Sequence, residues 1–315
     1  MEKRYRFSED STYRNLYEKS PLKEYAKHLA PYAGSDNLSY NLPISKAGCA
    51  TFPFASMVDS LNDLVECEDK DELVYNELSD TVSFLGQVHK ERKKVAIVLA
   101  GGGYNAVCTL VEATPFANYL YKEGFSSFTV TYGVGPNAKA PRPLDDLASF
   151  VRYLFAHERE LNIDMDGYSV TGFSAAGHLV ALFGSERVGY AHYGLKKPLL
   201  LGLCYPVISM DPLITHKGSS NAFLGPNPSK EDILLYSADR LVTKKYPATY
   251  LWQCERDYEV PFKNSELMDR ALIDHSVPHI YRHYDASAHS WGIAKGTLAN
   301  DWPTEFVSFY KSLSE

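Results

Sequence analysis

A serine among small residues is the first position at which this sequence could carry out chemistry. Ser174 stands in the run Gly172-Phe173-Ser174-Ala175-Ala176-Gly177, between a short β-prone stretch and the helix-prone stretch 175–183. A serine on a tight strand-to-helix turn exposes its hydroxyl, and small neighbours let the backbone turn sharply. Such a serine becomes a nucleophile only when a base takes its proton. The alternative is that Ser174 simply caps the helix that follows.

A run of three glycines offers backbone N–H groups to the same chemistry. The run Ala100-Gly101-Gly102-Gly103-Tyr104 follows an apolar, β-prone stretch. Fixed N–H donors stabilise the oxyanion that forms during acyl transfer, so Gly102, Gly103 and Ala175 are predicted to form an oxyanion hole. A nucleotide-binding loop fits less well, because Ala106 replaces the last glycine of Gly-x-Gly-x-x-Gly and no P-loop lysine follows. A flexible turn is the remaining alternative.

An acid that could orient a base lies in the loop 254–261, after another β-prone stretch. This loop contains Glu255, Asp257 and Glu259. We predict that Asp257 is the acid, because Glu255 lies nearer the strand and Glu259 nearer the next helix. In a triad, the acid orients the histidine and stabilises its charged form. Asp285 is a competitor, although it lies close in sequence to the histidine chosen as the base.

The candidate base is His289, in the small-residue loop 286–292 that follows the last β-prone stretch. A histidine in such a loop can reach a serine at the same edge of a sheet. His178 lies one helical turn after Ser174, so packing or hydrogen bonding is its expected role. His283 falls inside a predicted strand and is expected to be structural. The chain order serine, acid, histidine is the order found in α/β-hydrolases.

The elements between these loops must bring them together. From Lys93 onward, short apolar stretches alternate with amphipathic ones, which predicts an α/β fold with a mostly parallel sheet covered by helices on both faces. Ligands bind such sheets at the carboxyl ends of the strands, so the four loops are expected to meet there. The expected strands are 95–99, 128–132, 167–170, 199–205, 249–254 and 279–284, and the expected helices are 110–123, 143–154, 175–183, 264–273 and 304–313.

The chain is expected to have two unequal parts. Residues 1–92 lack the regular alternation and are predicted to be an N-terminal extension, either a cap or an edge layer. Helices are expected near 22–29 and 54–65, with one or two edge strands within 72–90. Residues 93–315 are predicted to be the catalytic domain. Within it, 208–245 interrupts the alternation with prolines and polar residues, and is read as an insertion over the sheet edge.

Composition narrows the class of protein. The chain has 315 residues, 45% of them hydrophobic, and a net charge of −7. This balance is typical of a globular protein and disfavours nucleic acid as a partner. The five cysteines (Cys49, Cys67, Cys108, Cys204 and Cys254) are scattered, which favours a reducing compartment and argues against a zinc site. The sequence has no apolar stretch long enough to span a membrane, and we expect a cytoplasmic location. Whether the chain forms a homo-oligomer is left open.

Taken together, the motifs resemble a known family. The sequence is similar to bacterial α/β-hydrolase esterases of the hormone-sensitive-lipase-like type, including acetyl-xylan esterases. The similarity covers roughly residues 93–313, with two departures: Ala176 stands where the nucleophile motif usually has glycine, and Ala100 stands where the glycine motif often has histidine. The motifs that carry it are Gly102-Gly103-Tyr104, 132–136, 143–147, Gly172-Phe173-Ser174-Ala175, Asp257-x-x-Val260-Pro261 and His289.

This resemblance implies a serine carboxylesterase that acts on a small-molecule ester. Ser174 would be the nucleophile, Asp257 the acid and His289 the base, and no metal or organic cofactor is implied. Two alternatives stay open: the same machinery acting on an amide or peptide, and a non-catalytic small-molecule-binding protein with this fold. Receptors of the second kind often lose a triad member, whereas all three are present here.

Overall fold

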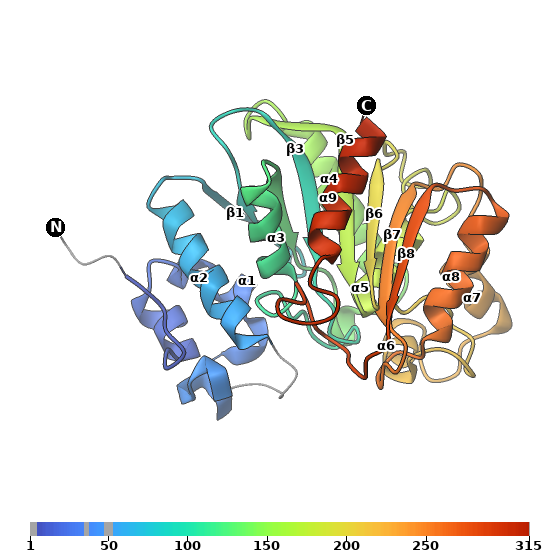
Figure 1. Cartoon of the computed structure of the whole chain (residues 1–315), viewed down its shortest axis with the longest axis horizontal. Helices are drawn as coiled ribbons and strands as arrows, with labels where there is room; N and C mark the ends of the chain where they lie inside the picture. The colour runs from blue at the N-terminus through green and yellow to red at the C-terminus, as the bar shows by residue number, and fades with distance from the viewer. Residues whose placement is uncertain (1–4, 35–37, 47–52, 315) are drawn as a thin grey trace.

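One eight-stranded sheet runs through the molecule (Figure 1). The computed structural model describes residues 5–34, 38–46 and 53–314. The strands lie in the order β1-β2-β4-β3-β5-β6-β7-β8, with β2 antiparallel to both of its neighbours and all other pairs parallel. Their bounds are β1 Leu73–Glu77, β2 Ser83–Gln87, β3 Lys93–Leu99, β4 Ser126–Val130, β5 Ile163–Phe173, β6 Leu200–Cys204, β7 Ala248–Cys254 and β8 His279–Tyr284.

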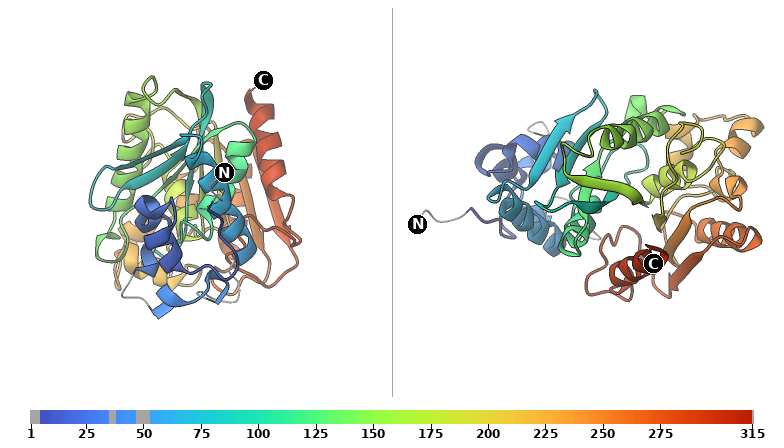
Figure 2. Two further views of the ribbon diagram at one scale, coloured as in Figure 1. Left: turned by 90° about the vertical axis from the view of Figure 1, so that its left-hand side faces the viewer. Right: turned by 90° about the horizontal axis from the view of Figure 1, so that it is seen from above.

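Helices cover both faces of this sheet. Helices α3 and α9 pack together on one face, and α4 and α5 pack together on the other (Figure 2). The α-helices are α1 Ala26–Leu29, α2 Phe54–Glu68, α3 Ala113–Lys122, α4 Arg142–Ala156, α5 Ala175–Phe183, α6 Lys217–Phe223, α7 Lys230–Leu235, α8 Lys263–Asp274 and α9 Trp302–Ser314. The chain also contains one short π-helix, η1 Asn15–Lys19, and several short 3₁₀ helices. These are η2 Lys23–Tyr25, η3 Pro31–Ala33, η4 Leu38–Asn41, η5 Ile44–Lys46, η6 Gly135–Asn137 and η7 Ala238–Leu241.

The central strands form because their sequences suit burial on both faces. Strands β4, β6 and β7 are buried along their whole length, and β3 is buried from Val95 onward. Continuous apolar runs of this kind are typical of parallel strands that helices cover on both sides. Since β3 to β7 run parallel to their neighbours in this part of the sheet, their carboxyl ends meet at one edge.

The predicted α/β architecture with a mostly parallel sheet is confirmed, and most predicted elements appear within a few residues of their expected bounds. Two bounds differ. Strand β5 begins at Ile163, earlier than expected, because it pairs with β3 on both sides of an irregularity between Lys94 and Ala96. Helix α3 begins at Ala113, not at residue 110: residues 109–112 form turns, and the N–H of Thr114 bonds five residues back, to the Thr109 carbonyl.

The N-terminal segment is attached to the sheet by a buried histidine. His28 of α1 contacts the Ser83 hydroxyl through Nδ1 (2.9 Å) and the Thr129 hydroxyl through Nε2 (2.8 Å). Burial lowers the pKa of His28 to about 3, so its ring is neutral at neutral pH. Strands β1 and β2 of the N-terminal extension lie at the edge of the same sheet as the rest of the chain.

The N-terminal helices enclose a hydrophobic cluster of their own. It includes Leu29, Leu61 and Leu64, and is joined to the sheet through Leu85 of β2. The larger cluster lies between the sheet and the helices on its two faces. Within the described ranges, every helix is too short or too polar to span a lipid bilayer.

Candidate active site

Ser174 lies on the tight turn between β5 and α5. Its backbone has φ 52° and ψ −117°, a conformation that a residue with a side chain adopts only when its surroundings hold it there. Two main-chain hydrogen bonds hold this turn: the Ser174 N–H donates to the Cys204 carbonyl (2.9 Å), and the Ser174 carbonyl accepts from the Val207 N–H (3.1 Å). The end of β6 and the residues just after it therefore hold Ser174 in this conformation.

The alanine at position 176 is accommodated without disturbing this turn. Ala176 is fully buried in α5. The close approach to the sheet occurs one residue later, at Gly177. A Cβ atom there would lie 2.6 Å from the Cβ of Pro206, which follows β6, and that distance is too short for two carbon atoms. The glycine that this helix needs is therefore Gly177.

The structure brings Ser174, His289 and Asp257 into one hydrogen-bonded chain. His289 Nε2 lies 2.9 Å from Ser174 Oγ, and His289 Nδ1 lies 2.7 Å from Asp257 Oδ2. The side chain of Asp257 is fully buried, and that of His289 is 7% exposed. Because water is largely excluded, the carboxylate can fix the tautomer of the imidazole, leaving Nε2 to accept a proton from the serine.

Asp257 is held by the loop that carries it. Its Oδ1 accepts the backbone N–H groups of Glu259 and Val260, both at 2.9 Å, and its Oδ2 also accepts from the Gln253 amide at 3.1 Å. These hydrogen bonds fix the orientation of the carboxyl group, so that Oδ2 faces His289.

The other acids considered for this role face other partners. Glu255 pairs with His283 (2.6 Å), and Asp285 pairs with Arg256 at the surface. The Glu259 carboxylate lies 3.8 Å from His216. The sequence places all of these acids close to the site, but only the path of the loops decides which one faces His289.

The glycine loop follows β3 and packs directly against the serine turn. A Cβ at Gly101 would lie 2.7 Å from the Phe173 carbonyl oxygen and 2.8 Å from the Ser174 Cβ, so only glycine fits this contact. Gly102 and Gly103 line the same pocket as Ser174 and His289. In the described part of the chain, their N–H groups donate to no protein acceptor. Ala175 begins α5, where the first N–H groups have no partner within the helix.

A buried glutamate connects the loops of the site. Glu112 Oε2 accepts the N–H of Gly101 (2.7 Å), and its Oε1 accepts the hydroxyl of Tyr205 (2.9 Å). That hydroxyl in turn accepts the N–H of Gly292, in the histidine loop, at 3.0 Å. Burial raises the pKa of Glu112, while the nearby His289 and these hydrogen bonds oppose the rise.

Sequence reasoning missed both Glu112 and Tyr205. Glu112 did carry a signal, since it is a charged residue within the otherwise apolar run Leu110-Val111-Glu112-Ala113, just after the glycine loop. Tyr205 carried none, because a tyrosine at the end of a strand is common. Its ring also packs edge-on against His289, with centroids 4.8 Å apart.

His178 is buried and hydrogen-bonded, in the role expected for it. Its Nε2 donates to the Tyr236 carbonyl (2.7 Å), so its Nδ1 accepts from the Tyr104 hydroxyl (2.9 Å). Burial lowers the pKa of His178 to about 4, so the ring is neutral at neutral pH. The contact ties α5 to Tyr104, the residue that directly follows the glycine run.

The catalytic pocket, lined by Ser174, His289 and the glycine loop, has a volume of about 450 Å³. His216 lies on its rim and comes from the segment 208–245. Its Nδ1 caps α6 by accepting from Ser219, so its Nε2 is directed towards Glu259. The pKa of His216 is lowered, because the effect of burial is larger than the opposite effect of the nearby Glu259 carboxylate. Among the described residues, no group of three or more His, Cys, Asp or Glu side chains could hold a metal ion.

The sequence profile of the BD-FAE family matches residues 84–190. Endo-1,4-beta-xylanase B of Butyrivibrio fibrisolvens is 28% identical over 220 residues, which are 67% of this chain and 34% of the relative. The acetylxylan esterase of Xylanibacter ruminicola is 30% identical over 151 residues, 47% of this chain and 30% of the relative. The chain thus spans about a third of the length of these curated relatives.

Among solved structures, the acetyl ester-xyloside bifunctional hydrolase of Caldicellulosiruptor lactoaceticus is similar along almost its whole length. It superposes with a TM-score of 0.68 at 30% sequence identity, covering 78% of this chain and 93% of that one. The similarity therefore extends over most of this chain.

Proposed function

This chain belongs to the α/β-hydrolase superfamily, among its acyl-ester hydrolases, and we propose that it hydrolyses short-chain carboxylic esters through a covalent acyl-enzyme. The observation that carries the proposal is the hydrogen-bonded chain from Ser174 Oγ through His289 to Asp257. It begins at a strained turn that opens into the catalytic pocket. An esterase needs this arrangement, whereas a simple helix cap does not.

In the first half of the reaction, Ser174 Oγ attacks the ester carbonyl carbon while its proton passes to His289 Nε2. The carbonyl oxygen becomes an oxyanion, which accepts hydrogen bonds from the N–H groups of Gly102, Gly103 and Ala175. Asp257 stabilises the imidazolium without taking its proton. When the intermediate collapses, the C–O bond to the alcohol breaks, and the departing oxygen takes the proton from His289.

In the second half, water attacks the acyl-enzyme and His289 Nε2 accepts one of its protons. Collapse of the second intermediate breaks the bond to Ser174 Oγ, which recovers a proton from His289, and the carboxylic acid leaves. No redox step occurs. The preference for a short acyl chain is supported by the acetyl esters that appear in the names of the similar proteins.

The test is hydrolysis of nitrophenyl esters of increasing chain length by the wild type and by Ser174→Ala. We expect Ser174→Ala to lower kcat by at least about 10⁴-fold, because the residues of a triad act as a unit. Ser185→Ala is the matched control, since Ser185 is a buried serine that lines no described pocket and its hydroxyl bonds only within its own turn. Full activity in Ser174→Ala would overturn the proposal.

Two further measurements separate the alternatives. A fluorophosphonate probe should label wild-type enzyme and not Ser174→Ala, whereas absence of labelling would favour a non-catalytic binding protein. Matched nitroanilides should react far more slowly than the esters. If the anilides reacted as fast, the same machinery would be assigned to an amide hydrolase.

The division of the chain and its cellular location are further parts of the proposal. We place the catalytic side chains in residues 93–315 and assign to residues 1–92 the role of an edge layer beside the site. A cytoplasmic location is supported by the free thiols of Cys67, Cys204 and Cys254, while Cys49 lies outside the described residues. Fractionation of the source cells would test the location.

A further inference from the structure

The backbone that follows β3 takes an uncommon course on its way to the catalytic pocket. Gly102, Gly103 and Tyr104 all have positive φ angles, of 134°, 63° and 60°. Glycine adopts such angles freely, whereas a tyrosine adopts them only when its surroundings hold it there. The N–H groups of Gly102 and Gly103 are the proposed oxyanion donors. The contacts that hold the two ends of this run, Ala100 and Tyr104, therefore also hold the donors between them.

Both ends of the run are held by one loop, residues 131–137, which follows β4 and which we call the supporting loop. The hydroxyl of Tyr132 donates to the Ala100 carbonyl (2.8 Å), and the N–H of Gly135 donates to the Tyr104 carbonyl (2.8 Å). Tyr104 and Tyr132 are buried, and their rings pack edge-on with centroids 6.0 Å apart. A movement of the supporting loop would therefore displace the glycine run at both of its ends.

The supporting loop is in turn held by a buried acid of α4. Asp146 Oδ2 accepts the N–H of Gly133 at 2.8 Å, and the Asp146 side chain is only 7% exposed. A Cβ atom at Gly133 would overlap the Asn137 carbonyl oxygen and crowd Asp146 Oδ2, so only glycine allows this approach. Gly133 is buried, and without Asp146 its N–H group would lose its hydrogen bond at a cost in free energy.

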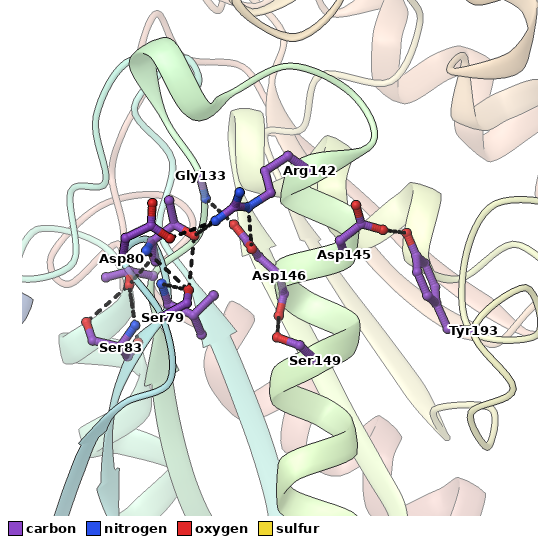
Figure 3. A network of polar contacts seen from close by, with 12 residues as sticks. Ser79, Asp80, Ser83, Gly133, Arg142, Asp145, Asp146, Ser149 and Tyr193 are labelled. Carbon is purple, nitrogen blue, oxygen red and sulfur yellow. Dashed lines mark hydrogen bonds and ion pairs between the residues drawn. The ribbon is translucent and has the colours of Figure 1, made fainter.

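Figure 3 shows how Asp146 itself is oriented. Arg142 lies one turn earlier in α4 and donates to Asp146 Oδ1 (2.9 Å). The same guanidinium group donates to Asp80 (2.8 Å) and Thr81 (3.0 Å), between β1 and β2. A planar guanidinium has its donors in fixed directions, so it sets the orientation of the carboxylate that it contacts. Asp146 therefore has one oxygen bound to Arg142 and the other turned towards Gly133.

From these contacts we propose that Asp146 is a positioning residue for the oxyanion hole. It fixes the supporting loop at Gly133, and the loop fixes both ends of the glycine run. The N–H groups of Gly102 and Gly103 then stay in place while charge develops on the ester oxygen. The effect on catalysis rests on the proposed esterase function, whereas the constraint on the glycine run rests on the contacts alone. This role also gives a task to two motifs that the triad does not use, 132–136 and 143–147.

The kinetic test asks which constant changes. Asp146→Ala should lower kcat for nitrophenyl acetate by about tenfold with little change in KM, because a displaced oxyanion donor should cost less than a deleted one, which costs about 10²- to 10³-fold. Asp145→Ala is the matched control and should keep the wild-type kcat. Asp145 is the neighbouring acid in α4, but it is exposed and accepts from Tyr193 (2.8 Å). Equal kcat values in Asp146→Ala and the wild type would overturn the proposal.

A transition-state analogue distinguishes positioning from a loss of folded enzyme. A trifluoromethyl ketone adds to Ser174 and carries an oxyanion, so its affinity depends on the oxyanion donors. With active sites counted by fluorophosphonate labelling, its Ki should rise in Asp146→Ala by about the factor by which kcat/KM falls. Tyr132→Phe removes only the hydroxyl that bonds to Ala100 and should raise the Ki less, and it serves if Asp146→Ala does not fold. An unchanged Ki would overturn the proposal.

Hydrogen exchange keeps failure of the esterase function recognisable. The amides of residues 99–106 should exchange faster in Asp146→Ala than in the wild type, and at the wild-type rate in Asp145→Ala. Faster exchange, together with a wild type that hydrolyses no ester, would sink the proposed function but keep Asp146 as the residue that positions the glycine run. Ester hydrolysis by the wild type, with unchanged exchange in Asp146→Ala, would sink the positioning role and keep the esterase.

Discussion

The Oε2 atom of Glu112 lies 2.7 Å from the backbone nitrogen of Gly101, so a buried carboxyl group holds the first glycine of the predicted oxyanion loop. The same carboxyl bonds to Tyr205, which in turn bonds to the histidine loop. Two loops that must keep their spacing during the reaction therefore share one anchor.

Replacing Glu112 should slow the chemistry more than it weakens substrate binding. Glu112→Ala leaves the buried N–H of Gly101 without an acceptor. We expect kcat to fall by about 10- to 100-fold, because a displaced oxyanion donor should cost less than a deleted one, which costs about 10²- to 10³-fold. KM for nitrophenyl acetate should change little. Glu112→Gln keeps one carbonyl oxygen for the Gly101 N–H and should lie between this variant and the wild type. Wild-type kcat in Glu112→Ala would show that the contact is only structural.

The Asp257→Asn substitution should reduce kcat severely although it preserves the shape of the side chain. The amide can still accept from Glu259 and Val260 through its oxygen, but its NH₂ group would face His289 and favour the wrong tautomer. We expect kcat to fall by about 10⁴-fold. Asp285→Asn is the control, because Asp285 is exposed and pairs with Arg256. If Asp285→Asn were the more damaging change, the acid would have been misassigned.

Stability should decrease in mildly acidic solution because of buried histidines. The pKa of His28 is lowered to about 3 in the folded chain, against about 6.5 when unfolded, so the unfolded state binds more protons between these values. The contribution of the neutral His28 ring to the free energy of unfolding is fully present above pH 6.5 and is lost as the pH falls towards 3. From pH 7 to pH 5, His28 alone should remove about 2 kcal/mol from the free energy of unfolding.

Urea denaturation at pH 5 and pH 7 would measure this loss. His178, with a pKa lowered to about 4, adds a change of the same sign, whereas the raised pKa of Glu112 adds one of opposite sign. Comparing the wild type with His28→Gln cancels both of these contributions. The variant should lose about 2 kcal/mol less between the two pH values than the wild type does. Equal losses would mean that His28 is not neutral in the folded state.

The sequence predicted much of the fold because each element could be recognised locally. Strand β8 and helix α5 occur at the predicted residues, since alternation of apolar stretches and small-residue turns is a short-range property. The candidate residues Ser174, Asp257 and His289 could be named for a similar reason: each stands in the loop that follows a recognisable strand. A parallel sheet then carries all such loops to the same edge.

What the sequence left open are relationships between distant residues. It could not show that Gly177, and not position 176, makes the close contact with Pro206, because this depends on how α5 lies on β6. It could not choose among the acids by contact, nor reveal that Glu112 faces Gly101 and Tyr205. The cavity of about 480 Å³ between residues 27–32, 75–83, 105–107 and 131–137 is another example, since these segments are separate in the chain. Local patterns determine the elements and their order, whereas burial and side-chain distance arise only when packing brings remote segments together.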